Sequence, residues 1–379
     1  MNRIKVAIAT HFPSDPNAPR GGVEAVSVNL ARWLASLEDL EVHVVTLDSN
    51  ITRVEAFDWQ NARIHRLPQG SGGQLRNALF DGRTQIQDFV NFLQPDVVHA
   101  HDIYGLMTKG LKITRVFTIH GFIYGDTLVS ETSLPRLRSE IWRYFETSAW
   151  ADQPRIISIN PYVRERLRGI SRGIIYDIDN PVGEGFFNIE RSEGMGIVFS
   201  AASICPRKNT LNLVRAASKV LQSGVQIQLR LAGPITNHRY GEDVKTVIKE
   251  CGLQDNVTLL NKIGTAQVMN ELASSSVFAL VSLEENSPMG IEEAMAAGVP
   301  ILTSNRCGMP YMVSNGETGY LIDPNDVDNI ASQLSALLTD SAKRKAMGER
   351  CRVVAMSRFH PKHVALRTRD VYLQAVGAT

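Results

Sequence analysis

Residues 277–304 read VFALVSLEENSPMGIEEAMAAGVPILTS: an apolar run, a polar turn, a short helical pattern and a second apolar run. Short apolar runs rich in β-branched residues and bounded by turn residues are typical of buried strands. Ser287 is placed to cap the intervening helix, Pro288 suits its first position, and Gly298 suits its end. The stretch therefore predicts a strand–helix–strand unit of a parallel sheet.

The same alternation runs through the whole chain. Helices are expected at residues 24–37 and 209–221. Strands are expected at 4–9, 42–47, 96–100, 115–120, 155–159 and 173–179, and again at 196–203, 226–233, 256–260, 277–283 and 299–304. Residues 181–196 are rich in glycine and charge and lack periodicity, which indicates a linker. We expect an α/β protein of two Rossmann-like, doubly wound domains, at 1–182 and 190–358, with a C-terminal helix at 360–379 packing back on the first.

Composition excludes several classes of protein. The 379 residues carry a formal net charge of only +1, which argues against a nucleic-acid-binding protein. The four cysteines are far apart and lack metal-ligand spacing, so we expect reduced thiols. The N-terminus does not resemble a signal peptide, and no stretch has the roughly 20 apolar residues that span a bilayer. We therefore expect a cytoplasmic protein, at most peripheral on a membrane.

A parallel α/β pattern also occurs in nicotinamide dehydrogenases, but the dinucleotide fingerprint is missing. That fingerprint requires G-x-G-x-x-G directly after a strand and an acidic residue about 20 residues later. Here the first strand leads into THFPSDPNAPRGGVEA, where Gly21 and Gly22 come late and no third glycine follows. A dehydrogenase is therefore not favoured.

Two glutamates flank the start of the helix predicted inside 283–302. Glu285 is expected on the loop before the helix and Glu293 on the helix, with Gly290 one turn away and leaving room for a ligand. Carboxylates accept hydrogen bonds from vicinal hydroxyls, and a helix N-terminus favours phosphate. From spacing alone, a solvated acidic face is an equally good interpretation.

Several segments together resemble glycosyltransferase family 4, which has the GT-B fold. Glu285 and Glu293 match its E-x7-E signature, and EAMAAG-x-P follows at 293–300. Residues 20–37, 204–217 and 315–326 are similar to the family's glycine loop, basic loop and N-G-x-T-G-x-L stretch. The resemblance implies two domains that face each other across a cleft, the first on the acceptor side and the second binding a nucleotide sugar.

The resemblance also implies residue roles. Glu285 contacts hydroxyls of the donor sugar, and Glu293 holds the ribose of the nucleotide. Arg207 and Lys208 neutralise the diphosphate leaving group as its charge develops. His120, at the end of the strand in TIHG, matches a family histidine beside the donor sugar.

The remaining donor-binding positions are Gly22, where glycine permits close approach of the backbone, and the start of the helix. The helix start comprises Ser287, Pro288, Met289, Gly290 and Ile291. The family implies retention of the anomeric configuration, with a leaving-phosphate oxygen as base. It therefore implies a retaining hexosyltransferase of glycan or glycoconjugate biosynthesis that uses a UDP- or GDP-sugar. The acceptor is open: a glycan, a lipid-linked molecule or a small molecule.

The chain departs from the family pattern at two places. Many members have E-G-F-G-L-P where this chain has residues 285–290, so the sugar is open. The usual P-N-G-V-D is replaced at residues 180–183 by NPVG. Glu284 and Glu292 offer the same eight-residue spacing one position earlier, and spacing alone cannot choose between the two pairs.

Three other features are ambiguous. Core packing is the favoured interpretation for His99, whereas His101, at the strand end, could face the cleft. Residues 133–150 mix arginines with tryptophans and could contact an anionic bilayer, although packing on the sheet is favoured. Asp177 and Asp179 form the D-x-D pattern of metal-using glycosyltransferases, but they lack a nearby third carboxylate. We therefore expect no metal and no other cofactor.

Two alternative functions would use the same residues. A nucleotide-sugar epimerase or hydrolase would share the donor pocket but need no acceptor. A non-catalytic nucleotide-sugar-binding subunit is a different class, against which the joint presence of Glu285, Glu293, Arg207, Lys208 and His120 argues.

Overall fold

The computed structural model describes residues 3–129 and 133–377. Its contacts divide the chain into two units. One runs to Tyr124, continues through Arg138–Pro181 and ends with the segment from His360; the other comprises Gly125–Leu137 and Val182–Phe359. Residues 125–137 thus group with the second unit, although the sequence places them within 1–182.

The first unit is built on an eight-stranded sheet in the order β3-β4-β2-β1-β5-β6-β7-β8. Its strands are β1 (Ile4–Ala9), β2 (Leu40–Asp48), β3 (Glu55–Trp59), β4 (Ala62–Pro68), β5 (Val97–His101), β6 (Thr114–Ile119), β7 (Arg155–Ser158) and β8 (Ile174–Asp177). All pairs are parallel except β3 with β4. The β3–β4 hairpin was not predicted, because β3 is a half-exposed edge strand without an apolar run.

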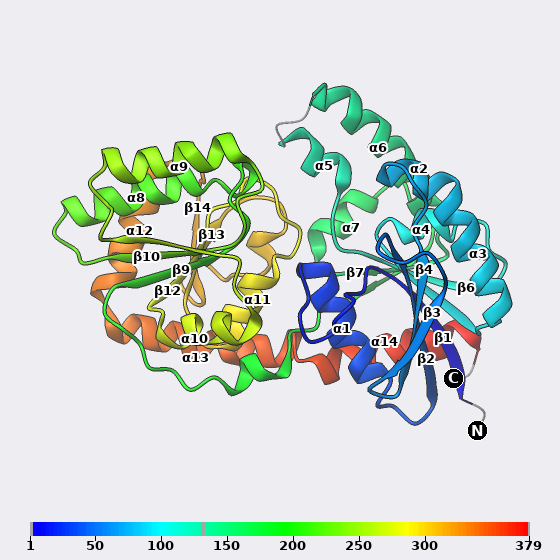
Figure 1. Cartoon of the computed structure of the whole chain (residues 1–379). Helices are drawn as coiled ribbons and strands as arrows, with labels where there is room; N and C mark the ends of the chain where they lie inside the picture. Colours follow the sequence, from blue (N-terminus) through cyan, green and yellow to red (C-terminus); the bar gives the residue numbers. More distant parts are fainter. Residues whose placement is uncertain (1–2, 130–132, 378–379) are drawn as a thin grey trace. The chain divides into compact units, whose positions relative to one another are not determined.

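Helices cover both faces of this sheet (Figure 1). They are α1 (Gly22–Leu34), α2 (Gln74–Leu79), α3 (Asp81–Leu93), α4 (Tyr104–Met107), α6 (Pro135–Ala151), α7 (Pro161–Leu167) and α14 (Pro361–Val376), with α5 (Ile123–Leu128) and α6 crossing the boundary between the units. The C-terminal α14 packs against α1, and Val364 and Tyr372 are buried in the same core as Val6 and Val44.

The second unit has a six-stranded, all-parallel sheet in the order β11-β10-β9-β12-β13-β14. Its strands are β9 (Ile197–Ala201), β10 (Gln228–Ala232), β11 (Val257–Asn261), β12 (Val277–Leu280), β13 (Ile301–Ser304) and β14 (Gly319–Ile322). Its helices are η1 (Glu184–Asn188), η2 (Pro206–Lys208), α8 (Thr210–Gln222), α9 (His238–Glu250), α10 (Thr265–Ser274), α11 (Met289–Ala296), η3 (Met309–Tyr311), α12 (Val327–Thr339) and α13 (Ser341–Arg358).

Near-continuous apolar strands explain this arrangement, because a parallel sheet is buried on both faces. β12 and β13 are buried at every residue. α8 presents Leu213, Val214 and Val220 to the same core. The predicted unit at 277–304 is confirmed as β12–α11–β13, and the Rossmann-like architecture of both units agrees with the sequence.

Candidate functional site

The basic loop and the first glutamate follow two neighbouring strands of the second unit. η2 follows β9, and the loop that holds Glu285 follows β12. β9 and β12 pair in parallel, and the strand order reverses between them. The crevice beyond the carboxyl ends of the strands at such a reversal is where open α/β sheets bind ligands.

Glu285 contacts both cations of the basic loop. Its side chain is buried, and its Oε1 accepts hydrogen bonds from Nη1 of Arg207 at 3.0 Å and from Nζ of Lys208. Nη1 of Arg207 also donates to the carbonyl of Glu284 at 2.8 Å, and the amide of Leu283 donates to the carbonyl of Arg207 at 2.8 Å. The two loops are therefore tied together at the strand ends.

The charges in this cluster stabilise one another. Burial alone would raise the pKa of Glu285, but the charges of Lys208 and Arg207 outweigh it and lower the pKa. Burial likewise would lower the pKa of Arg207, and the nearby acidic groups, Glu285 and Asp126 foremost, together more than offset it. Arg207 and Lys208 are balanced by Glu285 and by Asp126, whose Oδ1 is 3.6 Å from Arg207, and the two cations are the groups that would attract an anionic group such as a diphosphate.

Sequence reasoning missed Asp126, which lies on the segment that groups with the second unit. Its Oδ1 is 3.6 Å from Nη1 of Arg207. Burial raises the pKa of Asp126 to about 6, although the Arg207 charge opposes the shift. No motif in the sequence marks this residue, because the contact arises from folding alone.

The first turn of α11 has unsatisfied amides. Among the described residues, no acceptor meets the amides of Met289 and Gly290, which lie at the positive end of the helix dipole. The predicted Ser287 cap is wrong: Pro288 occupies the N-cap, and Oγ of Ser287 donates to Oε1 of Glu292 at 2.6 Å. A buried carboxylate is the stronger acceptor for that hydroxyl.

The side chains at the start of α11 point into the core. Met289 and Ile291 are buried, and a Cβ on Gly290 would lie 2.9 Å from the Phe278 ring. Glycine is needed at position 290 for packing on β12, but the residue is itself partly exposed, so the expectation that a ligand approaches this face stays a prediction. What Met289 and Gly290 offer a ligand comes from their backbone amides.

Glu293 lies one turn further along α11 and is half-buried. No hydrogen-bond partner for its side chain occurs in the described part of the chain, and burial raises its pKa to about 8. The carboxyl is therefore protonated at neutral pH in this structure. A protonated carboxyl both donates and accepts hydrogen bonds, which matches a pair of vicinal hydroxyls.

The two glutamate pairs with eight-residue spacing differ in their surroundings. Glu292 is completely buried and bonded to Ser287, and Glu284 accepts a hydrogen bond from Sγ of Cys307 at 2.9 Å. Only the later pair combines a carboxylate beside two cations, Glu285, with a half-buried carboxyl that has no hydrogen-bond partner among the described residues, Glu293.

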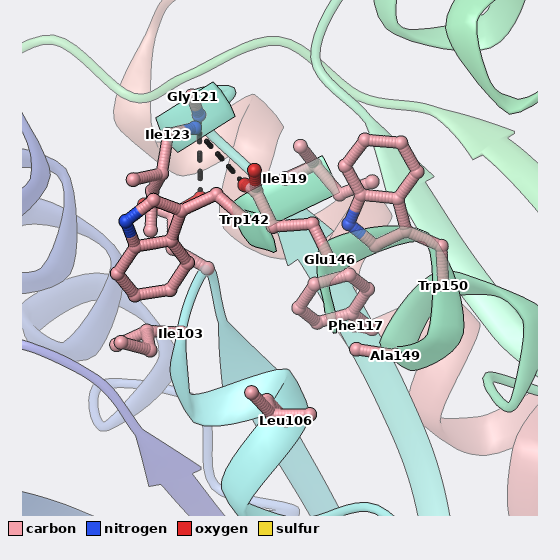
Figure 2. Close-up of a pocket in the computed structure, with 11 residues that line it drawn as sticks. Ile103, Leu106, Phe117, Ile119, Gly121, Ile123, Trp142, Glu146, Ala149 and Trp150 are labelled. Carbon is pink, nitrogen blue, oxygen red and sulfur yellow. Dashed lines mark hydrogen bonds between the residues drawn. The ribbon is translucent and has the colours of Figure 1, made fainter. Parts of the chain in front are cut away.

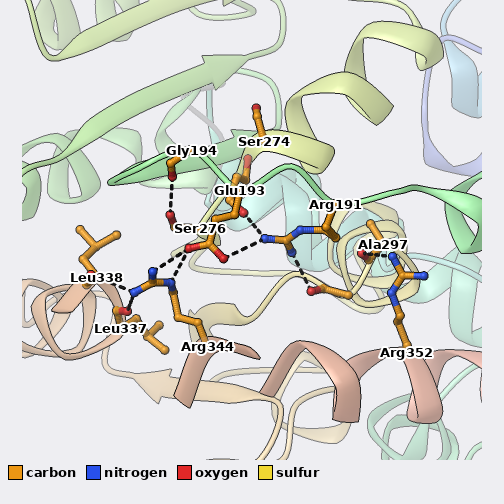
Figure 3. A network of polar contacts seen from close by, with 12 residues as sticks. Arg191, Glu193, Gly194, Ser274, Ser276, Ala297, Leu337, Leu338, Arg344 and Arg352 are labelled. Atoms are coloured by element: carbon orange, nitrogen blue, oxygen red, sulfur yellow. Dashed lines mark hydrogen bonds and ion pairs between the residues drawn. The ribbon is translucent and has the colours of Figure 1, made fainter. Parts of the chain in front are cut away.

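The C-terminal end of α11 is fixed by arginines (Figure 3). Arg352 donates to the carbonyl of Ala297 at 3.0 Å, and Arg191 donates to the carbonyl of Gly298 at 2.6 Å. Gly298 has φ = 75°, which confirms the predicted helix end. Cations at this end complement the helix dipole and hold α11, and therefore Glu293, in place.

In the first unit, His120 follows β6 and both of its ring nitrogens are engaged. Nδ1 lies 3.0 Å from Oδ1 of Asn180, and Nε2 lies 3.0 Å from Nδ1 of His101. The His120 amide donates to Oδ1 of Asp102 at 2.7 Å. Burial lowers the pKa of His120 more than the Asp102 carboxylate raises it, so the ring is neutral at neutral pH.

The neighbouring histidines are both buried. His99 lies between Oγ1 of Thr118 and the hydroxyl of Tyr372, each at 2.7 Å, which confirms a packing role. The expectation that His101 could face a cleft is wrong, since its side chain is buried and it packs on His120. Gly22 is the first residue of α1.

The loop after His120 is held by a carboxylate of α6 (Figure 2). Glu146 accepts hydrogen bonds from the amides of Ile123 at 3.0 Å and Tyr124 at 2.9 Å. A small pocket beside this loop is lined mainly by apolar side chains, Trp142 and Trp150 among them. The Trp-rich face of α6 therefore packs inward, as the sequence favoured.

The D-x-D pattern lies at the end of β8, and its first member is paired. Asp177 accepts hydrogen bonds from Nε and Nη2 of Arg164 at 3.0 and 2.7 Å. Within residues 3–129 and 133–377, no group of three His, Cys, Asp or Glu side chains is placed to hold a metal ion.

Both halves of the chain match models of known protein families. Residues 20–182 match the model for Glycosyltransferase Family 4, and residues 184–354 match the model for Glycosyl transferases group 1. The chain is 25% identical to N-acetyl-alpha-D-glucosaminyl L-malate synthase of Bacillus anthracis, over 98% of this chain and 97% of that protein.

Two solved structures show the same fold. Sucrose-phosphate synthase from Thermosynechococcus elongatus superposes with a TM-score of 0.85 at 21% identity, covering 100% of both chains. Alr3699/HepE of Anabaena, in complex with UDP-glucose, superposes with a TM-score of 0.74 at 15% identity, covering 98% of this chain and 100% of that one. Across the described residues, no helix combines the length and apolarity that crossing a bilayer requires.

Proposed function

Because this chain belongs to glycosyltransferase family 4 and has the GT-B fold, we propose that it transfers a sugar from a UDP- or GDP-sugar to an acceptor with retention of configuration. One observation supports this class of donor. The Arg207–Lys208–Glu285 cluster, and the two α11 amides that have no acceptor among the described residues, come directly after neighbouring strands of the sheet. That combination of cations and helix N-terminus suits a diphosphate. The UDP-glucose bound by Alr3699/HepE supports uridine as the first base to test.

In this proposal the two glutamates contact different parts of the donor. Glu293 receives the ribose hydroxyls, since its carboxyl is at a half-buried helix face with no other partner among the described residues. Glu285 receives hydroxyls of the transferred sugar while Arg207 and Lys208 turn toward the diphosphate. Bond cleavage moves negative charge onto that diphosphate, so these cations stabilise the transition state more than the ground state.

We assign His120 the role of a rigid contact to the donor sugar. Asn180 and His101 occupy both ring nitrogens, and the ring is neutral. We therefore assign proton removal from the acceptor to a leaving-phosphate oxygen and not to this imidazole. Gly22 allows close approach of the backbone to the phosphates or the acceptor.

The reaction in this proposal needs no divalent metal and takes place in the cytoplasm. Arg207 and Lys208 supply the positive charge that a metal would otherwise bring, and Arg164 already pairs with Asp177 of the D-x-D pattern. The four cysteines are free thiols, as is usual in a reducing compartment. The acceptor is a glycan, a lipid-linked molecule or a small molecule.

A thermal-shift screen tests the donor class. We expect UDP, GDP or one of their sugars to raise the melting temperature, since a ligand that binds only the folded state stabilises it. ADP and its sugars are the comparison. The identified donor is then incubated with candidate acceptors, and the anomeric configuration of the product is read by NMR.

Product analysis also separates the rival activities. A transferred sugar with its configuration retained supports the proposal. Free sugar or an epimerised nucleotide sugar, formed equally with and without acceptor, would identify the hydrolase or epimerase. Tight binding without any turnover would identify a binding subunit.

A further inference from the structure

The outward side of α6 carries an apolar stripe that the proposed function does not use. Leu137, Ile141 and Tyr144 follow the i, i+4, i+7 spacing of one helical face, and their side chains are 58%, 41% and 70% exposed. Leu134, just before the helix, is 70% exposed. Leu137, Ile141 and Tyr144 belong to one continuous helix, which fixes their positions relative to one another, and Leu134 precedes that helix.

The opposite side of the same helix is firmly anchored. Ser139, Trp142, Ala149 and Trp150 are buried, and Oγ of Ser139 donates to the carbonyl of Tyr124 at 2.8 Å. Figure 2 shows Trp142, Glu146 and Trp150 on the inward face, around the pocket. The stripe is therefore the outer face of a docked amphipathic helix, and inward rotation would expose two tryptophans.

Positive charge accompanies the stripe. Glu140 is paired with Arg143, and Glu146 is bound to backbone amides. No carboxylate of the described residues pairs with Arg136 or Arg138, both of which are exposed. An apolar face with unpaired arginines beside it is complementary to a negatively charged lipid surface, since the aliphatic stems lie along the acyl boundary and the guanidinium groups reach phosphate.

We propose that α6 is a docking surface for an anionic lipid bilayer. Leu137, Ile141 and Tyr144 enter the boundary between head groups and acyl chains, and Arg136 and Arg138 contact lipid phosphates. A stripe of this size is smaller than a standard protein–protein interface, which takes 20–30 residues a side, whereas it suffices for weak, reversible attachment to a membrane. The proposal does not depend on the sugar or nucleotide that the protein uses.

Cosedimentation with vesicles tests it, using the full chain without substrate. The vesicles contain either pure phosphatidylcholine or phosphatidylcholine with about one third phosphatidylglycerol. We expect at least about tenfold stronger partitioning onto the anionic vesicles, weakening as salt is raised. A Leu137→Gln/Ile141→Gln variant should lose about tenfold of that binding, and Arg136→Gln/Arg138→Gln should lose the preference for anionic lipid.

The matched control is Val353→Gln/Met356→Gln, which removes two apolar side chains that are 60% and 44% exposed on α13. It should bind vesicles as the unaltered chain does. Circular dichroism checks that every variant is folded. Equal partitioning onto both vesicle types, no partitioning at all, or full binding by the Leu137→Gln/Ile141→Gln variant would overturn the proposal. So would a dimer in solution that this variant dissociates, because the stripe would then be an interface between copies.

Discussion

Replacing Glu293 by Gln should change stability in a strongly pH-dependent way. The folded protein holds the Glu293 proton up to a pKa of about 8, against an ordinary value of 4.5. Below about pH 4.5 both states are protonated, and the carboxyl has no effect relative to Gln. Between 4.5 and 8 the unfolded chain ionises and the folded protein does not, so stability falls as pH rises. Above 8 the loss is complete.

The magnitude follows from the size of the gap. About 3.5 pK units at about 1.4 kcal/mol each give roughly 5 kcal/mol as an upper bound. Because the side chain is half-buried, water reduces the effect, and we expect about 2–3 kcal/mol. Glu293→Gln should therefore match the unaltered protein at pH 4.5 and exceed its stability by this amount at pH 8.

Denaturation followed by circular dichroism at pH 5, 6, 7, 8 and 9 measures the difference. Glu250→Gln, on the exposed end of α9, is the control for replacing a surface carboxyl by an amide. A Glu293→Gln difference that is flat across this range would refute the reasoning, because the carboxyl would then titrate alike in the folded and unfolded chains.

Three further predictions concern the charged groups. Arg207→Ala and Lys208→Ala should each lower kcat by about 100-fold with smaller changes in KM, and an unchanged kcat would reject their leaving-group role. Exhaustive EDTA treatment should leave turnover intact, as should Asp179→Asn; activity lost to EDTA and restored by magnesium or manganese would require a metal. Arg352→Ala removes donors from three carbonyls, those of Phe187, Ile189 and Ala297, and should cost about 2–4 kcal/mol of unfolding free energy by calorimetry.

Much of the fold follows from local pattern, and the failures have physical causes. The buried parallel strands are continuous apolar runs, so β1, β9, β12 and β13 were located within a few residues. The β3–β4 hairpin lies at a sheet edge, where alternation is weak and no run appears. Gly298 was identified because a positive φ at a helix end favours glycine.

The site was less predictable than the fold. Ser287 fits the local rule for a helix cap, but a buried carboxylate on the helix itself competes for its hydroxyl. Asp126 and Arg207 are 81 residues apart in the sequence, and no motif in the sequence links the two positions. Residues 285 and 293 were found through a family resemblance, whereas their contrasting environments, one ion-paired and one protonated, required the folded chain.

The most direct test of the account measures the rate at which a Glu285→Gln variant releases nucleoside diphosphate from the donor. Glutamine keeps the shape of the side chain but removes the charge between Arg207 and Lys208 and weakens acceptance from sugar hydroxyls. We predict that turnover falls at least about 100-fold while the Kd for the nucleoside diphosphate, measured by titration calorimetry, changes by less than about threefold. Equal turnover by the variant and the unaltered enzyme, or no release from any UDP- or GDP-sugar by the unaltered enzyme, would contradict the account.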